Sequence, residues 1–187
     1  SPISKDVTRW NAMAEEWIRA HSNVSENEGC DLTIKCIADG DEDLSVGYDI
    51  SSAQPGFISM SIAAYSYGHG APHGYTDIAQ SNFLLAAGRE LIEDDLFTAG
   101  SKWQEILAAE SFKTIAAERP ELAATADDID SLIAGPDTWN ITAAALIVHI
   151  PLGLRYGYLN GSIDVEIPWS KLKPYLRPDL PITLNLD

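Results

Sequence analysis

The stretch that decides the fold is residues 57–84, FISMSIAAYSYGHGAPHGYTDIAQSNFL, which follows a turn at residues 54–56. Apolar side chains recur at every second position of its first half, and this is the period of a half-buried β-strand. They are Ile58, Met60, Ile62 and Ala64. We therefore expect one strand over residues 57–67 and a second over residues 75–84. Because only the glycine-rich loop of residues 68–74 joins them, the two strands should pair antiparallel.

Upstream of this stretch, the sequence predicts a helix and a hairpin. Apolar residues at three- and four-residue spacing indicate a helix over residues 6–21, with Asp6 as its N-cap. Alternating patterns predict strands over residues 31–38 and 44–50. The acidic segment of residues 39–43 lies between these strands and has the composition of a hairpin turn.

Downstream of this stretch, the pattern changes to helix and then returns to strand. The expected elements are helices over residues 102–119 and 125–134, strands over residues 139–148 and 162–167, and a short helix over residues 168–173. In the first of these helices Phe112 is out of phase with the apolar face, and Pro120 ends the helix. The tail of residues 182–186 is expected to dock as an edge strand.

The order of these elements decides the fold class. Strands follow strands through short turns, and the helices are grouped rather than alternating with strands. This order predicts an α+β fold, with an antiparallel sheet packed against a few helices in a single compact unit. Within it we distinguish an N-terminal helix and hairpin region, residues 1–56, from residues 57–187, as parts of one continuous globular unit.

The charge of the chain limits its partners. It has 28 Asp and Glu residues against 12 Lys and Arg residues, a net charge of −16. Nucleic acids and anionic membrane surfaces are bound through Lys and Arg, so neither is an expected partner. No apolar run approaches the roughly 20 residues that a membrane-spanning helix needs. A basic partner is compatible with this charge, because a field of this sign would accelerate its encounter with the protein.

The two cysteines, Cys30 and Cys36, leave two readings open. They lie in the segment GCDLTIKC, where the spacing does not match a CxxC redox pair and no His or third Cys is near enough for a zinc site. In an extracytoplasmic protein a disulfide could close this short loop, whereas in the cytosol both would be free thiols.

The loop GHGAPHG is the most unusual segment, and three readings of it stay open. It can be a structural crossing between strands, in which His69 and His73 bond to the backbone. It can be a binding loop, with Gly70 and the adjacent Tyr75 contributing to the contact. It can also hold a metal, with Asp77 as the third ligand. We expect neither a metal nor another cofactor.

Other candidate residues have ordinary structural explanations beside the functional ones. Adjacent acids at residues 93–95 resemble a carboxylate pair for acid–base catalysis, but acids before a helix more often interact with its N-terminus. His149 lies in an apolar strand and is expected to be hydrogen-bonded. Tyr156 and Tyr158 lie in a glycine-rich loop, where tyrosines serve either as packing contacts or as binding anchors. No nucleophile elbow, zinc-protease helix or phosphate-binding loop motif occurs.

Three of these segments together resemble the RsiV-like extracytoplasmic domain family, which occurs in the anti-sigma factor RsiV and in the deacetylase PdaC. The resemblance spans roughly residues 58–176. Its matches are Gly70, Ala71 and His73; Gly88, Leu91, Asp95, Leu96 and Phe97; and Tyr158, Gly161, Ile167, Pro168 and Leu172. Two departures occur, since Pro72 separates Ala71 from His73, and Gly157 stands where RsiV-like members often have proline.

The resemblance implies a location and a class of function. Such domains lie in the cell envelope, periplasmic or secreted, and the chain, which begins at Ser1, could be anchored through a preceding segment. In RsiV the domain is a receptor that binds lysozyme and is not an enzyme. We therefore expect a non-catalytic binding or sensing module for a basic protein such as lysozyme, or for wall glycan. The alternative is a metal-assisted hydrolase, or a deacetylase-associated domain, acting on cell-wall glycan.

Overall fold

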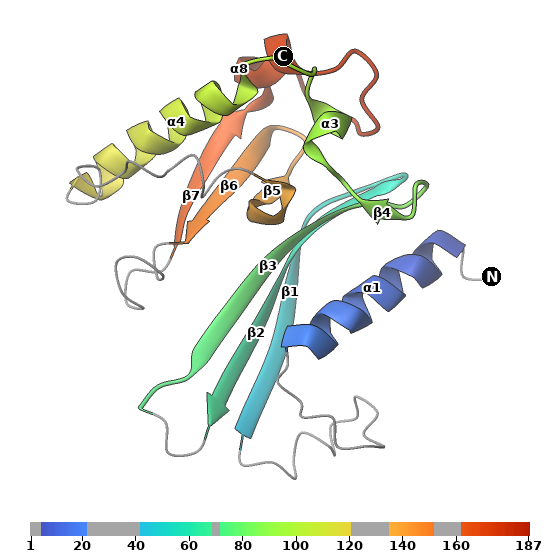
Figure 1. Cartoon of the computed structure of the whole chain (residues 1–187), viewed down its shortest axis with the longest axis vertical. Coiled ribbons are helices and arrows are strands. Elements are labelled where there is room, and N and C mark those ends of the chain that lie inside the picture. The colour runs from blue at the N-terminus through green and yellow to red at the C-terminus, as the bar shows by residue number, and fades with distance from the viewer. Residues whose placement is uncertain (1–4, 22–41, 69–71, 121–134, 152–161) are drawn as a thin grey trace. The chain divides into compact units, whose positions relative to one another are not determined.

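The computed structural model describes residues 5–21, 42–68, 72–120, 135–151 and 162–187 (Figure 1). These residues form antiparallel sheets of four and of three strands, together with several helices. The predicted α+β class with antiparallel pairing is confirmed. The chain divides into two units, residues 1–49 with 61–79 and residues 50–60 with 80–187. The boundary expected after residue 56 stays a prediction.

The four-stranded sheet is built around residues 57–84, the stretch that decides the fold. Its strands are β1 (Glu42–Gln54), β2 (Phe57–Gly68), β3 (Tyr75–Leu84) and β4 (Arg89–Glu90), in the order β1-β2-β3-β4. Only Pro55 and Gly56 separate β1 from β2, and Gly56 has φ +88°, a backbone conformation that glycine adopts easily. The strands predicted at residues 57–67 and 75–84 are confirmed.

Two predictions in the N-terminal part need correction. β1 starts at Glu42 and ends at Gln54, so it is longer than the strand expected over residues 44–50 and includes the last residues of the acidic turn. The polar sequence SSAQ continues the strand because the tight turn at Pro55 holds it against β2. Helix α1 spans Lys5–His21, so Asp6 lies within its first turn and is not the N-cap. The strand expected over residues 31–38 lies outside the described residues.

The three-stranded sheet corrects the prediction of one strand over residues 139–148. It contains β5 (Trp139–Ile141), β6 (Ala145–Pro151) and β7 (Ser162–Pro168), all antiparallel. Thr142 makes the turn between β5 and β6, since its hydroxyl accepts a hydrogen bond from Ala145 N (2.9 Å) and donates one to Ala145 O (3.0 Å). The register then pairs Trp139 with Val148.

The helices lie mainly in the second unit. They are α3 (Glu93–Leu96), α4 (Trp103–Glu118), the 3-10 helix η1 (Pro136–Thr138), α8 (Trp169–Leu172) and the 3-10 helix η2 (Lys173–Tyr175). The helices predicted over residues 102–119 and 168–173 are confirmed, and α4 packs against β7. Phe112 is 46% exposed, as its out-of-phase position indicated. The helix expected over residues 125–134 lies outside the described residues.

The core of the second unit is centred on aromatic side chains. Phe97 stacks on Trp103 with ring centroids 4.4 Å apart. The rings of Trp103 and Trp139 form a T-shaped pair with centroids 5.6 Å apart. Alternate residues of β7 complete this core, since Ile163, Val165 and Ile167 are buried and their neighbours are exposed. This period-two pattern is the one that the sequence showed for the strand.

The C-terminal tail docks, but not as an edge strand. Gln54 binds Thr183 with both ends of its amide: Nε2 donates to Thr183 O (2.9 Å), and Oε1 accepts from Thr183 N (2.8 Å). Asn185 N donates to Ala143 O (2.7 Å), and Ile182 is buried. The side-chain amide of Gln54 thus holds the tail at Thr183, where an edge strand would be held by a ladder of backbone hydrogen bonds.

Candidate functional site

Most of the residues predicted to form the site fall outside the described part of the chain. His69, Gly70, Tyr156 and Tyr158 belong to this group, as do Cys30 and Cys36. The side chains of Tyr75 and Asp77, both in β3, are also outside it. Their proposed roles in binding, metal ligation or a disulfide therefore stay predictions.

His73 is the one predicted loop histidine that the structure describes. Its ring is exposed, and Nδ1 lies 3.1 Å from Gly74 O, which is the kind of backbone bond that the structural reading expects. The neighbouring Gly74 is required by a close approach, because a β-carbon added there would collide with the ring and hydroxyl of Tyr65. Part of the GHGAPHG pattern thus has a packing explanation.

The described residues include no group of three His, Cys, Asp or Glu side chains arranged to hold a metal ion. The metal reading of the loop depends on His69, outside those residues. His149, by contrast, is placed clearly: its Nδ1 lies 2.7 Å from Asp164 Oδ1 and its Nε2 lies 2.7 Å from Asn140 Oδ1. The prediction that His149 is hydrogen-bonded is confirmed.

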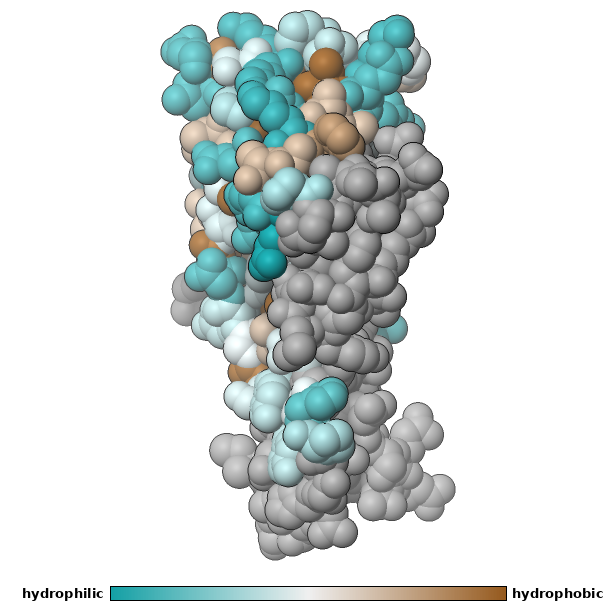
Figure 2. Space-filling view, turned by 90° about the vertical axis from the view of Figure 1, so that its left-hand side faces the viewer, coloured by the Kyte–Doolittle hydropathy of each residue, from teal (hydrophilic) through white to brown (hydrophobic). Residues whose placement is uncertain are grey.

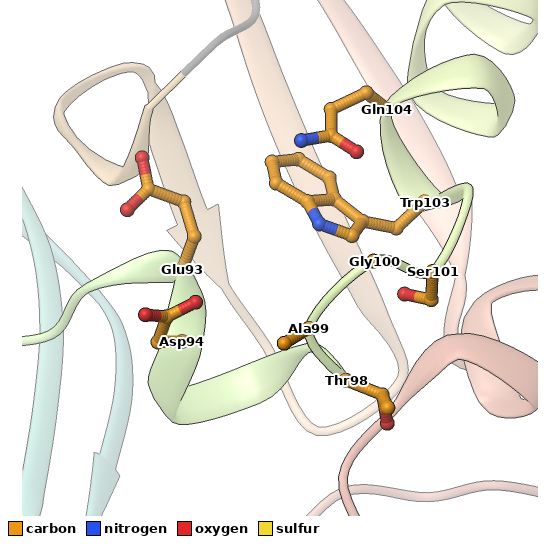
Figure 3. A pocket seen from close by; sticks show the side chains of 8 residues that line it. All are labelled: Glu93, Asp94, Thr98, Ala99, Gly100, Ser101, Trp103 and Gln104. Carbon is orange, nitrogen blue, oxygen red and sulfur yellow. The ribbon is translucent and has the colours of Figure 1, made fainter.

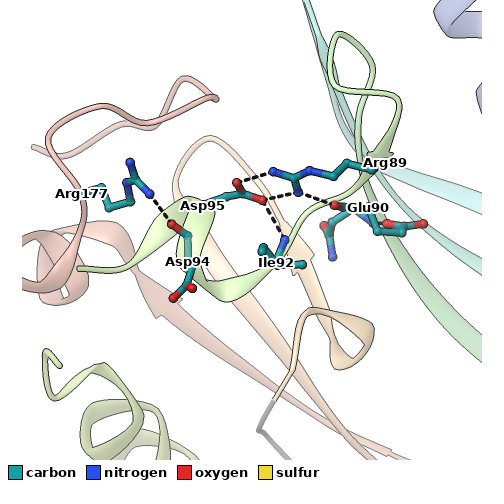
Figure 4. A network of polar contacts seen from close by, with 7 residues as sticks. Arg89, Glu90, Ile92, Asp94, Asp95 and Arg177 are labelled. Atoms are coloured by element: carbon teal, nitrogen blue, oxygen red, sulfur yellow. Dashed lines mark hydrogen bonds and ion pairs between the residues drawn. The ribbon is translucent and has the colours of Figure 1, made fainter. Parts of the chain in front are cut away.

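In the acidic segment after β4, the side chain of Asp95 has a structural role (Figure 4). Arg89 donates to both carboxylate oxygens of Asp95, at 2.7 Å each, and Asp95 Oδ2 also accepts from Ile92 N at 2.9 Å. These contacts, of which the hydrogen bonds from Arg89 have the largest effect, hold the pKa of Asp95 below its usual range. Asp95 therefore interacts with the start of α3, as predicted for these acids.

Arg177 ties the C-terminal segment to the same helix. Its Nη1 donates to Asp94 O at 2.7 Å, and its guanidinium pairs with Asp179. Phe97 also forms an isolated antiparallel bridge with Leu176. Since Leu91, Leu96 and Phe97 are all buried, the segment that carried part of the family resemblance holds the fold together.

A second carboxylate belongs to the β3–β4 pairing. Glu90 accepts from the Ser81 hydroxyl (2.9 Å) and from Asn82 N (3.1 Å). Glu90 as a whole is exposed, but its carboxylate turns back towards the strands. Burial of the carboxylate raises its pKa, and this effect exceeds the lowering by the two hydrogen bonds. Asn82 in turn donates from Nδ2 to Pro136 O and to Trp139 O.

The sequence did not predict the pocket between α3 and the start of α4 (Figure 3). We call it the α3–α4 pocket. It is open to solvent, with a volume of about 410 Å³, and is lined by Glu93, Asp94, Thr98, Ala99, Gly100, Ser101, Trp103 and Gln104. The sequence placed Trp103 only within the helix expected over residues 102–119. The acids of residues 93–95 were noticed, but nothing in the pattern placed an indole beside them.

The comparisons with known proteins identify which solved structures share the fold of this chain. No family model and no curated protein matches the sequence. Among solved structures, a DUF3298 family protein of Pseudomonas aeruginosa PAO1 is similar over 97% of this chain and 84% of its own, with 12% identity and a TM-score of 0.65. A DUF3298 family member of Bacteroides fragilis is similar over 94% of this chain and 71% of its own, with 12% identity and a TM-score of 0.55. The chain therefore has the fold of DUF3298 family proteins, a domain family of the kind that the sequence indicated, and the closer RsiV-like relationship stays a prediction.

Proposed function

We propose that this protein is a non-catalytic binding module of the cell envelope that recognises a basic protein such as a lysozyme. The observation that carries the proposal is the net charge of −16. Both the extracytoplasmic location and the basic partner belong to this proposal. Among the residues that the structure describes, no helix is long and apolar enough to cross a membrane.

Several cations of the described residues form ion pairs with acids of the same chain. These pairs are Arg89 with Asp95, Lys102 with Glu105, Lys171 with Glu110, and Arg177 with Asp179. Figure 2 shows one side of the molecule, on which hydrophilic residues predominate among those described and hydrophobic ones are scattered between them. The net charge of −16 attracts a basic protein and raises its association rate.

Attraction alone does not make a specific complex, so apolar and aromatic anchors are needed. We propose His69, Gly70, His73, Tyr75, Tyr156 and Tyr158 as the loop residues in contact with the partner. The first unit has further exposed apolar side chains. Val46 and Tyr48 are two residues apart on β1 and are 40% and 73% exposed, and Tyr65 of β2 is 43% exposed. Since side chains two apart in a strand share a face, Val46 and Tyr48 offer one contact surface.

Calorimetric titration with a basic c-type lysozyme tests the proposal. An unrelated basic protein of similar size, such as cytochrome c, is the control for attraction by charge alone. We expect lysozyme to bind at physiological salt and cytochrome c not to bind. The double variant His69→Ala, Tyr158→Ala should lose lysozyme binding while its melting temperature stays within a few degrees of the parent. Equal binding of both basic proteins would reject specific recognition.

The same preparation tests the alternative of a metal-assisted hydrolase acting on cell-wall glycan. That reading needs a metal held by His69, His73 and Asp77. Metal analysis of protein purified without chelator, followed by assay on wall glycan, would detect it. A stoichiometric metal together with glycan cleavage would replace the binding module with the hydrolase.

A further inference from the structure

We propose that the α3–α4 pocket receives an arginine or lysine residue of a basic protein partner, binding its cationic group and a backbone carbonyl together. This inference rests on the proposed function, because it names the chemistry by which a basic partner would be held. The pocket lies within the second unit, and its volume of about 410 Å³ is in the range typical of small-molecule sites, about 300–1,000 Å³.

Two unpaired carboxylates form one wall of the pocket. The side chains of Glu93 and Asp94 form no hydrogen bond or ion pair with any residue in the described ranges. The nearest candidates are already engaged, since Arg89 pairs with Asp95 and Arg177 pairs with Asp179. Arg177 lies close enough to Asp94 for their charges to interact, but neither carboxylate has an ion-pair partner in the described residues, and this favours a ligand that carries a positive charge.

The opposite wall contains an indole N–H group that has no acceptor in the described part of the chain and is open to the pocket. Trp103 is only 7% exposed, and stacking on Phe97 together with the edge contact to Trp139 fixes its ring. Within the described part of the chain, the Nε1–H group has no hydrogen-bond partner. Figure 3 shows this nitrogen on the side of the ring that faces α3 and Ala99. Because the ring is fixed and its N–H is open to the pocket, this group can donate a hydrogen bond to a ligand there.

The start of α4 adds to the same preference. Trp103 and Gln104 are its first residues, and no side chain caps this end of the helix. The uncapped N–H groups of a first helical turn attract acceptors and negative charge. The donor wall therefore prefers a carbonyl oxygen, while the acidic wall prefers a cation.

Two residue types meet both demands. Arginine and lysine carry a cationic group at the end of a flexible chain, and their own backbone supplies a carbonyl. A free anion would be repelled by Glu93 and Asp94, and a simple inorganic cation would offer the indole N–H no acceptor of its own. The overall charge of −16 brings a basic protein to this surface in the first place.

The experiment follows the indole signal of Trp103 by NMR in protein labelled with ¹⁵N. The chain has five tryptophans, and triple-resonance assignment identifies this signal without any variant. N-acetyl-arginine amide is the probe, and N-acetyl-citrulline amide is its uncharged counterpart of the same shape. We expect the arginine compound to shift the Trp103 indole signal in a saturable way and the citrulline compound to bind at least tenfold more weakly. Equal effects of the two compounds, or none, would overturn the proposal.

Variants separate the pocket from general charge. Glu93→Gln with Asp94→Asn should weaken binding of the arginine compound at least tenfold. Glu118→Gln with Glu166→Gln makes the same change in net charge at exposed positions outside the pocket, and it should leave the binding unchanged. Equal weakening in both double variants would overturn the pocket as the site. A saturable shift by glucosamine but not by the arginine compound would assign the pocket to an amino sugar instead.

Titration with lysozyme distinguishes a failure of this inference from a failure of the proposed function. If the parent protein and the Glu93, Asp94 variant bind lysozyme equally, the pocket takes no part in docking, while the binding function stands. If the parent binds the arginine compound at Trp103 but not lysozyme, the proposed partner is rejected. In that case the inference that the pocket binds a cationic group together with a carbonyl oxygen still stands.

Discussion

Arg89 and Asp95 are joined by two hydrogen bonds of 2.7 Å each, which close the segment between β4 and α3 (Figure 4). The same carboxylate accepts from Ile92 N at 2.9 Å. One aspartate therefore both pairs with the strand before it and holds the start of its own helix. This double use distinguishes Asp95 from Glu93 and Asp94, whose side chains face the α3–α4 pocket.

Replacing Asp95 with asparagine should lower the free energy of unfolding at pH 7 by about 1 kcal/mol, the usual size for losing such hydrogen bonds near a surface. The lowered pKa of Asp95 means that its stabilisation is present above the pKa of the unfolded chain, about 3.9. It is lost as the pH falls through the still lower folded value. Urea unfolding at pH 7 and pH 3 should therefore show a difference from the parent that shrinks in acid. A difference that stays constant would contradict the ion-pair assignment.

Glu90 should show the opposite pH dependence. Burial raises its pKa, so its contribution to stability is fully present below the unfolded value, about 4.3, and is lost as the pH rises through the folded value. Glu90→Gln keeps groups that can bond to Ser81 and Asn82 but removes the buried charge. The variant should melt at a higher temperature than the parent at pH 8, and this gain should vanish near pH 4. An equal gain at both pH values would show that charge is not the cause.

Gly88 and Gly47 form a matched pair for testing backbone strain. Gly88 has φ +64° in the turn before β4, whereas Gly47 in β1 has open space around a β-carbon and no positive φ. Gly88→Ala should cost about 1 kcal/mol, because alanine resists the left-handed conformation. Gly47→Ala should be neutral or slightly stabilising. Chemical denaturation of both variants checks this, and equal losses would contradict the turn geometry.

Leu107 and Phe112 test the orientation of α4. Leu107 is fully buried, while Phe112 is 46% exposed on the same helix. Leu107→Ala should cost about 2–5 kcal/mol, the range for truncating a buried leucine. Phe112→Ala should change stability by less than about 0.5 kcal/mol. A larger loss from Phe112 than from Leu107 would mean that the opposite face of the helix is packed.

The sequence predicted those elements whose local pattern agrees with their tertiary surroundings. The alternation in β2 and β7, and the turn at Pro55 and Gly56, are signals of this kind. The break between β5 and β6 was missed because the segment from Trp139 to Val148 contains no glycine or proline. That turn is stabilised by the hydroxyl of Thr142, whose contacts with Ala145 exist only in the folded structure.

The α3–α4 pocket was missed for a related reason. Its donor, Trp103, contacts the ring of Trp139, which is distant in sequence, and its acids come from another helix. No residue spacing within a single segment predicts that these side chains lie close together. The candidate residues that could be read locally are those in unusual loops, at positions such as His69 and Tyr158, and their role awaits the binding measurements.

The measurement that tests the central claim most directly is the dissociation constant for a basic lysozyme, determined over a range of salt concentrations. A binding module that recognises its partner through anchors as well as charge should keep micromolar or tighter affinity at physiological salt, with only a moderate decline from low salt. Binding that is present at low salt and vanishes at physiological salt would contradict the account, because screening over about 8 Å removes attraction between exposed charges.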